Sequence, residues 1–275
     1  MRSWFIIYFW ITVIFIYFIP VNTYGRVYIN TPKDTTIIIC GIPVDISYPE
    51  GKVNGTILML PGWNFSRNDC CDKSSFCDKA LSKGYCLIKP EMGKSVYHSR
   101  IYKETHKEWK KFPTRIILTD SIIPFIQDHF YLLKNGQKNY LYGISTGARG
   151  VALLAIYTKN IFVACACLSG DYDQTKMPKD NLMKEYYGDF TKFPDRWKGV
   201  DNPLLNASKI KIPLYISHGK KDKVVPYNQS EIFYKDLVKY NSNLKHSLFI
   251  DDKAEHNYNF WDSRTEDILM FFSRF

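Results

Sequence analysis

The 275-residue chain is long enough for one sizeable domain with its own hydrophobic core, and not comfortably long enough for two. Its apolar fraction of 45% and charged fraction of 23% exclude a disordered protein and are ordinary for a globular one. The formal net charge of +10 comes from lysines scattered along the chain, which indicates a solvated basic surface and argues against a nucleic-acid partner.

Residues 1–25 differ from the rest of the chain. Arg2 is followed by an almost unbroken apolar run over residues 4–21, and then by the small residues Thr23 and Gly25 before Arg26. This order is typical of a secretory signal peptide with its cleavage site. Because the run is also just long enough to span a bilayer, an uncleaved membrane anchor is the alternative. In both cases we expect the remaining domain outside the cytoplasm, secreted or periplasmic.

Short apolar runs bounded by turn residues predict buried strands at residues 36–40, 43–48, 56–60, 85–88, 139–144, 162–168, 213–217 and 247–250. Apolar positions at helical spacing predict helices at residues 113–131, 147–157, 228–240 and 261–272, the first kinked by Pro124. Strands that alternate with helices indicate an α/β fold, with a mostly parallel central sheet flanked by helices. Two antiparallel strands are expected at its start.

Residues 171–208 interrupt this alternation. The segment is polar and aromatic, contains Pro178, Pro194 and Pro203, and has no clear period. It is too long for an ordinary connection in a compact domain. We interpret it as a cap-like insertion, within one domain of residues 26–275, that arches over the carboxyl ends of the strands.

All seven cysteines follow the N-terminal segment, so an exported protein can oxidise them. Cys70 or Cys71 is placed to pair with Cys77 within one loop. A metal site in this cluster would need a second Cys-x-x-Cys pair or a suitable histidine nearby, and neither is present in the sequence. Cys165 and Cys167 alternate in a predicted strand and indicate small core residues.

The run Gly143-Ile144-Ser145-Thr146-Gly147 follows a predicted strand and opens a predicted helix. This is the context of a nucleophile elbow, in which a sharp turn exposes the serine hydroxyl and requires glycine on both sides. The helix N-terminus behind the serine favours negative charge that develops during a reaction. Ser145 is therefore the predicted nucleophile.

A serine nucleophile needs a base, and the base needs an acid that orients it. Of the six histidines, only His256 fits both a place after Ser145 and a place just after the last predicted strand. Asp222 follows the strand before it and is the predicted acid, with Asp171 and Asp173 as its rivals one strand earlier. The resulting chain order of serine, acid and histidine is that of an α/β-hydrolase.

Two backbone N–H groups are expected to form an oxyanion hole. One belongs to Thr146, next to the nucleophile, and the other to Trp63 in the loop after residues 56–60, with Asn64 as the alternative. His218 comes directly before the Asp222 turn, and we expect a structural role for it. These groups predict acyl transfer without a metal or an organic cofactor.

The motifs resemble those of the α/β-hydrolase superfamily, and more narrowly the catalytic domain of the prolyl-oligopeptidase and dienelactone-hydrolase-like group. The likeness is carried by Asn202-Pro203-Leu204-Leu205, Ile212-Pro213-Leu214, His218-Gly219 with Asp222 and Val225-Pro226, and Glu255-His256-Asn257-Tyr258. In two places the chain departs from that group. Ala148 stands where its elbows usually carry a further glycine, and Leu60-Pro61-Gly62-Trp63 replaces a His-Gly-Gly type of loop.

The resemblance implies a serine hydrolase whose substrate is a small molecule or a peptide. We expect a carboxylic ester hydrolase, because only residues 171–208 are available to hold a peptide on both sides of the scissile bond. A serine peptidase or amidase of the prolyl-oligopeptidase type is the first alternative. A catalytically silent binding protein on the same fold is the second.

Overall fold

The computed structural model describes residues 34–109 and 113–275. The predicted signal peptide or anchor, and the cleavage site expected before Arg26, lie outside the described residues. Among the described helices, none combines the length and the apolar character that a bilayer crossing requires.

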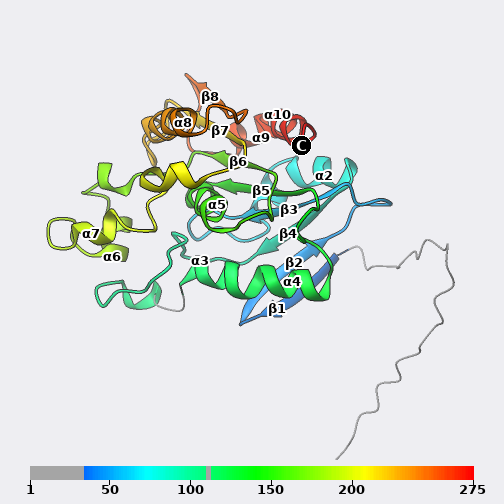
Figure 1. The fold of residues 1–275 in the computed structure, drawn as a ribbon, viewed down its shortest axis with the longest axis horizontal. Coiled ribbons are helices and arrows are strands. Elements are labelled where there is room, and N and C mark those ends of the chain that lie inside the picture. The colour runs from blue at the N-terminus through cyan, green and yellow to red at the C-terminus, as the bar shows by residue number, and fades with distance from the viewer. Residues whose placement is uncertain (1–33, 110–112) are drawn as a thin grey trace, which may run out of the picture. The chain divides into compact units, whose positions relative to one another are not determined.

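In the described part of the chain, eight strands form one sheet in the order β1-β2-β4-β3-β5-β6-β7-β8 (Figure 1). The strands are β1 Asp34–Ile39, β2 Ile42–Ser47, β3 Gly55–Leu60, β4 Tyr85–Pro90, β5 Asn139–Ile144, β6 Ala164–Leu168, β7 Leu214–Gly219 and β8 Ser247–Asp251. The β1–β2 and β2–β4 pairs are antiparallel, and all the others are parallel. The predicted α/β fold, with a mostly parallel sheet that starts with two antiparallel strands, is confirmed.

Helices flank the sheet (Figure 1). They are α1 Asp69–Lys73, α2 Phe76–Ser82, α3 Thr114–Ile117, α4 Ile123–His129, α5 Thr146–Tyr157, α6 Asn181–Tyr187, α7 Pro194–Trp197, α8 Asn228–Tyr240, α9 Tyr258–Ser263 and α10 Thr265–Phe272. Short 3₁₀ turns lie at η1 Lys107–Trp109, η3 Gln174–Lys176 and η4 Leu204–Lys209, and a π-helical turn, η2 Leu118–Ile122, joins α3 to α4.

Two predicted helices are divided in the structure. The kink expected at Pro124 is replaced by the turn η2, after which Pro124 stands in the first turn of α4. Helical backbone continues from η2 into α4, and the wider π-helical turn just before Pro124 accommodates a residue that has no N–H to donate. The helix predicted over residues 261–272 is instead the pair α9 and α10, which meet at Arg264.

The strands supply two apolar cores, one on each face of the sheet. Leu58 and Leu141 belong to the core that α4, α5 and α8 cover. Their neighbours Ile57 and Tyr140 belong to the core that α2, α9 and α10 cover. Because successive strand residues point to opposite faces, a strand buried on both faces consists of continuous apolar residues. This explains why the sequence shows unbroken apolar runs.

Residues 171–208 have a small apolar cluster of their own. Met183, Tyr186 and Trp197 pack there against Val96, which follows β4 in the chain. The Tyr186 hydroxyl donates to the carbonyl of Lys94 at 2.8 Å. The insertion is therefore docked on the segment that leaves the carboxyl end of β4.

One disulfide joins Cys71 to Cys77 among the described residues, so Cys71 rather than Cys70 is the partner. It links α1 to α2, which cover the sheet on the α10 side. Cys165 and Cys167 are buried thiols in β6, as their alternation predicts.

Candidate active site

Ser145 lies at the sharp turn between β5 and α5 with φ 56° and ψ −126°. A Cβ on Gly143 would lie 2.3 Å from the carbonyl oxygen of Gly147, and a Cβ on Gly147 would lie 2.0 Å from that of Leu60. Both positions therefore have to be glycine, as the elbow motif predicts. A positive φ at serine is strained, and the packed backbone around the turn holds it in place.

Ala148, which stands where related elbows usually carry a further glycine, is matched by a glycine on the neighbouring strand connection. A Cβ on Gly170, just after β6, would lie 2.8 Å from the Ala148 methyl group. Glycine at position 170 therefore leaves the room that the extra methyl group of this elbow occupies.

Ser145, His256 and Asp222 are joined by hydrogen bonds. His256 Nε2 lies 3.0 Å from Ser145 Oγ, and His256 Nδ1 lies 2.6 Å from Asp222 Oδ2. Because the Asp222 oxygen accepts, Nδ1 carries the proton, and Nε2 of the neutral ring is free to accept from the serine hydroxyl. The three residues thus come together with the connectivity expected from the sequence, and their catalytic roles stay predictions.

The Asp222 carboxylate is buried, and each of its two oxygens accepts two hydrogen bonds. Its Oδ1 accepts the backbone N–H groups of Val224 and Val225, both at 2.8 Å. Its Oδ2 accepts from His256 and also from His218 Nε2 at 3.1 Å. Burial raises the pKa of Asp222, but the hydrogen bonds from His218 and His256 outweigh burial and hold that pKa well below its usual range. The carboxylate is therefore charged whenever the protein is folded at neutral pH.

The histidine is supported from the α9 side. The Trp261 ring meets the His256 ring edge to face, with centroids 5.0 Å apart. Trp261 is itself fixed, because its Nε1–H donates to Ser169 Oγ at 3.0 Å. Asn257, next in the chain, accepts the N–H of Phe260 and caps α9. These contacts limit the positions that the imidazole can take.

The rival acids have other partners. Asp171 Oδ2 accepts from Arg149 at 2.8 Å, and Asp173 Oδ1 accepts from Thr175 and Asn202. Burial raises the pKa of Asp171 to about 6, and the guanidinium of Arg149 opposes that rise. Neither carboxylate takes the place that Asp222 holds beside His256.

The loop after β3 lies against Ser145, since a Cβ on Gly62 would lie 3.2 Å from the Cβ of Ser145. Within the described residues, the N–H groups of Trp63 and Thr146 donate no hydrogen bond. The N–H of Asn64 is already used, because it donates to the carbonyl of Gly93 at 2.9 Å. Of the two candidates in this loop, Trp63 therefore has the N–H that is free to bind an oxyanion.

The Trp63 side chain packs in a cluster of aromatic rings that also contains Trp109 and, from the insertion, Tyr186. Its ring lies edge-on to Trp109, with centroids 4.6 Å apart, and to Tyr186, with centroids 6.1 Å apart. Tyr186 is buried, like Tyr172, Tyr187 and Trp197. Most aromatic residues of the insertion are therefore packing residues, and Trp63 connects them to the elbow.

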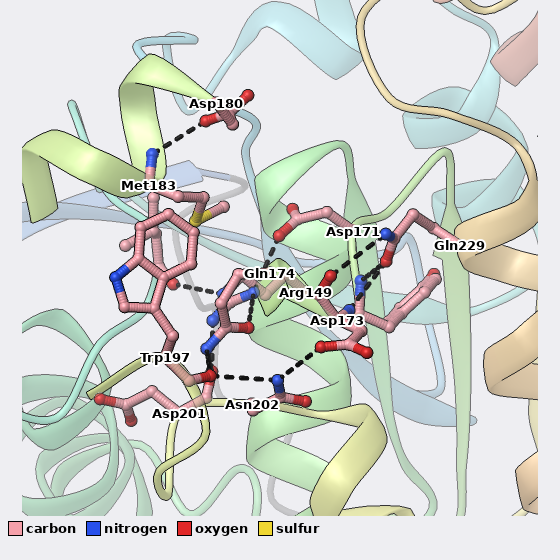
Figure 2. A network of polar contacts seen from close by, with 12 residues as sticks. Arg149, Asp171, Asp173, Gln174, Asp180, Met183, Trp197, Asp201, Asn202 and Gln229 are labelled. Atoms are coloured by element: carbon pink, nitrogen blue, oxygen red, sulfur yellow. Dashed lines mark hydrogen bonds and ion pairs between the residues drawn. The ribbon is translucent and has the colours of Figure 1, made fainter. Parts of the chain in front are cut away.

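Arg149 joins residues 171–208 to α5, the helix that follows Ser145 (Figure 2). Its guanidinium is completely buried and donates to five acceptors. They are Val96 O at 3.1 Å, Asp171 Oδ2 at 2.8 Å, Gln174 Oε1 at 3.1 Å, the Tyr187 hydroxyl at 3.1 Å and the carbonyl of Asp201. Arginine has five N–H donors, so every one has an acceptor.

Among known families, the sequence profile of the prolyl oligopeptidase family matches residues 125–274, more than half of the chain. The chain belongs to the prolyl oligopeptidase family. It is accordingly a serine hydrolase of esterase or peptidase type. None of the curated protein sequences matches it.

Solved structures with the same fold include both esterases and peptidases. An S-formylglutathione hydrolase from Agrobacterium tumefaciens aligns with a TM-score of 0.69 at 13% identity, over 89% of this chain and 97% of that one. A fluorophosphonate-binding serine hydrolase from Staphylococcus aureus aligns with a TM-score of 0.69 at 16% identity, over 87% and 96%. An acylaminoacyl peptidase from Pyrococcus horikoshii aligns with a TM-score of 0.63 at 18% identity, over 88% of this chain and 41% of that one.

Two residues of the site make contacts that the sequence alone does not show. His218 is bonded to the acid itself, and its position four residues before Asp222 at the end of a strand is the one sequence signal for that contact. Arg149 gives no signal on its own, because a basic residue in the first turns of a helix is usually solvated. A charged residue in the otherwise apolar and small run of α5 is the only hint of its burial.

Proposed function

We propose that the chain hydrolyses acyl compounds in two steps, with Ser145 as nucleophile, His256 as general base and Asp222 as the acid that orients the base. The observation that supports this most directly is the continuous hydrogen-bonded path from Ser145 Oγ through His256 to Asp222. The serine attacks the substrate carbonyl while His256 Nε2 takes its proton, and Asp222 stabilises the imidazolium. His256 then protonates the leaving group, and a water molecule activated by the same base releases the acyl group.

The oxyanion of each tetrahedral intermediate would be bound by the N–H groups of Trp63 and Thr146. Both are unused in the described part of the chain, and both flank the nucleophile in space or in sequence. Such preorganised donors contribute roughly 3–4 kcal/mol each to the stabilisation of the transition state.

We favour a carboxylic ester as substrate, with a peptide or amide as the second candidate. An ester has the better leaving group and depends less on an accurate proton delivery by His256. Peptide cleavage also needs a surface that fixes the chain on both sides of the bond. The family match supports the peptidase alternative, and the esterases among the structural neighbours support the favoured one.

The test of the nucleophile is Ser145→Ala together with a fluorophosphonate probe. We expect turnover to fall by roughly 10⁴-fold or more with an unchanged fold, because the alanine enzyme has no group to form the acyl intermediate. The probe should label the unaltered protein at Ser145 and leave the variant unlabelled. Comparable activity in the variant, or labelling of another serine, would contradict the assignment.

The test of bond type compares kcat/KM for p-nitrophenyl acetate and butyrate with that for aminoacyl and prolyl anilides. We expect the short esters to react faster. A faster anilide or peptide would replace the esterase by the peptidase.

We further propose that the protein is exported, with a signal peptide that is removed near Arg26. The supporting observation is the order of Arg2, an apolar run and the small residues Thr23 and Gly25. N-terminal sequencing of the native protein should give a chain that starts near Arg26. An intact Met1 in a membrane fraction would favour the anchor instead.

A further inference from the structure

His218 forms a second histidine contact to the Asp222 carboxylate, opposite His256. It lies at the end of β7 and is completely buried. Its Nε2 is 3.1 Å from Asp222 Oδ2 and 3.0 Å from the carbonyl oxygen of Val225. Both of those atoms only accept hydrogen bonds, so Nε2 must carry a proton.

The other ring nitrogen is also satisfied. His218 Nδ1 lies 2.8 Å from the hydroxyl of Ser230 on α8, which is buried and able to donate. A neutral His218 with its proton on Nε2 therefore has every polar atom paired. The ring has one orientation that allows this, because a flipped ring would point a carbon atom at the carboxylate.

We propose that His218 is a positioning residue for the reaction at Ser145, because it holds the Asp222 carboxylate in the orientation that receives His256 and tunes the strength of that contact. This inference rests on the proposed function. Oδ2 shares its negative charge between two imidazole N–H groups, one from each histidine. Without the His218 N–H, the charge on Oδ2 would act on His256 alone, so the interaction of the carboxylate with the imidazole depends on His218.

Of the groups near the Asp222 carboxylate, only the two histidines contact it with ionisable side chains. β7 contributes His218, the loop after β8 contributes His256, and α8 contributes the uncharged Ser230. Charged neighbours on the same loops are exposed to solvent, which screens them: Lys221, Lys223 and Glu255 are exposed, and Lys220 pairs with Asp252 at 2.7 Å.

The experiment compares His218→Leu, which fills the space without a donor, with His218→Gln, which keeps an N–H donor within reach of Asp222. Active sites are counted by fluorophosphonate titration, so that misfolded protein does not enter the rates. We expect the leucine variant to lose roughly 10- to 100-fold in kcat with KM changed less than about threefold. We also expect the acid limb of its pH profile to move to higher pH, and the glutamine variant to recover most of both changes.

Two results would overturn the proposal. One is a folded leucine variant whose kcat and acid limb stay within about twofold of the unaltered enzyme. The other is an equal loss in both variants with an unchanged pH profile, which would assign His218 a merely structural role. Ser145→Ala, measured in parallel, separates a failure of the proposed nucleophile from a failure of this inference.

A measurement on the unaltered protein covers the case in which neither variant folds. The ¹⁵N chemical shifts of the histidine rings report which nitrogen carries the proton. His218 should carry its proton on Nε2 at neutral pH, because Nε2 faces two acceptors. A proton on Nδ1 with a bare Nε2 would refute the contact on which the proposal depends.

Discussion

Replacing Arg149 by methionine should destabilise the protein strongly, although Arg149 is not a catalytic group. Methionine fills part of the space of the arginine stem but donates to none of the five acceptors. Asp171, whose side chain is 3% exposed, would then be a buried carboxylate without a cation. Removing one partner of a buried ion pair costs about 3–5 kcal/mol, a large share of a total stability of about 5–15 kcal/mol.

The measurement is urea unfolding at about pH 8, followed by tryptophan fluorescence, for Arg149→Met, Asp171→Asn and the double variant. The double variant should be more stable than Arg149→Met by at least about 1 kcal/mol, because asparagine has no charge to leave unpaired. Trypsin adds a local readout, since Lys179, Lys184 and Lys192 lie in the exposed parts of the insertion. Cleavage there should accelerate in Arg149→Met before the core unfolds.

The reasoning would be refuted by an Arg149→Met protein within about 1 kcal/mol of the unaltered one, because no buried pair would then have been broken. It would equally be refuted if Asp171→Asn gave no recovery in the Arg149→Met background. In that case the loss would come from packing of the side chain and not from the charge left on Asp171.

Three further predictions follow from particular contacts. Burial lowers the pKa of His98 from 6.5 to about 4, so between these values the unfolded chain binds a proton that the folded chain does not, and stability falls as the pH falls. The share of His98 in the difference between the unfolding free energies at about pH 7.5 and about pH 5 is about 2 kcal/mol; His246, whose pKa burial also lowers to about 4, adds to that difference, and Asp171, whose pKa burial raises to about 6, opposes it. Urea unfolding of His98→Gln should therefore give a pH-dependent difference about 2 kcal/mol smaller than that of the unaltered protein, and an undiminished difference would contradict the assignment to His98. Gly147→Ala should lower kcat/KM by more than about 100-fold, because its Cβ would lie 2.0 Å from Leu60 O, whereas Ala148→Gly should stay within about threefold. Replacing Cys71 and Cys77 by serine should lower the unfolding free energy by about 2 kcal/mol while kcat stays within about twofold, and a larger loss of kcat would mean that α1 and α2 support the site.

The fold could be predicted because its strands are buried on both faces. Such strands consist of unbroken apolar residues, and the turn residues between them mark each end. The same reasoning missed α1 and α2, because Asp69–Lys73 and Phe76–Ser82 are too short to show a helical period. It also missed α6 and α7, whose aromatic residues pack on the loop after β4 and so follow no sheet or helix repeat.

The residues that meet at the candidate site could be predicted where a short motif in the sequence marks them. Ser145, Asp222 and His256 each follow the carboxyl end of a strand, and chain order together with this placement was enough to choose among the histidines. Contacts that depend on which side chains meet in space were not predictable. His218 had the same sequence context as a structural histidine, and only the structure places its Nε2 against Asp222.

The position of Arg149 determines how residues 171–208 are attached to the rest of the domain. Ser145 is the N-cap of α5, and Arg149 stands one helical turn later on the same helix. Residues 171–208 therefore cannot move away from the domain as a lid unless the hydrogen bonds of the buried Arg149 guanidinium break. A force that displaced this segment would act directly on α5, the helix that follows Ser145. Asp201 adds a second attachment, because it accepts from Ser99 and from Arg115. The rings of Trp63, Trp109 and Tyr186 pack on one another in this fixed arrangement, so we expect their replacement by alanine to loosen the packing of residues 171–208 on the loop after β3, measured as faster trypsin cleavage within residues 171–208.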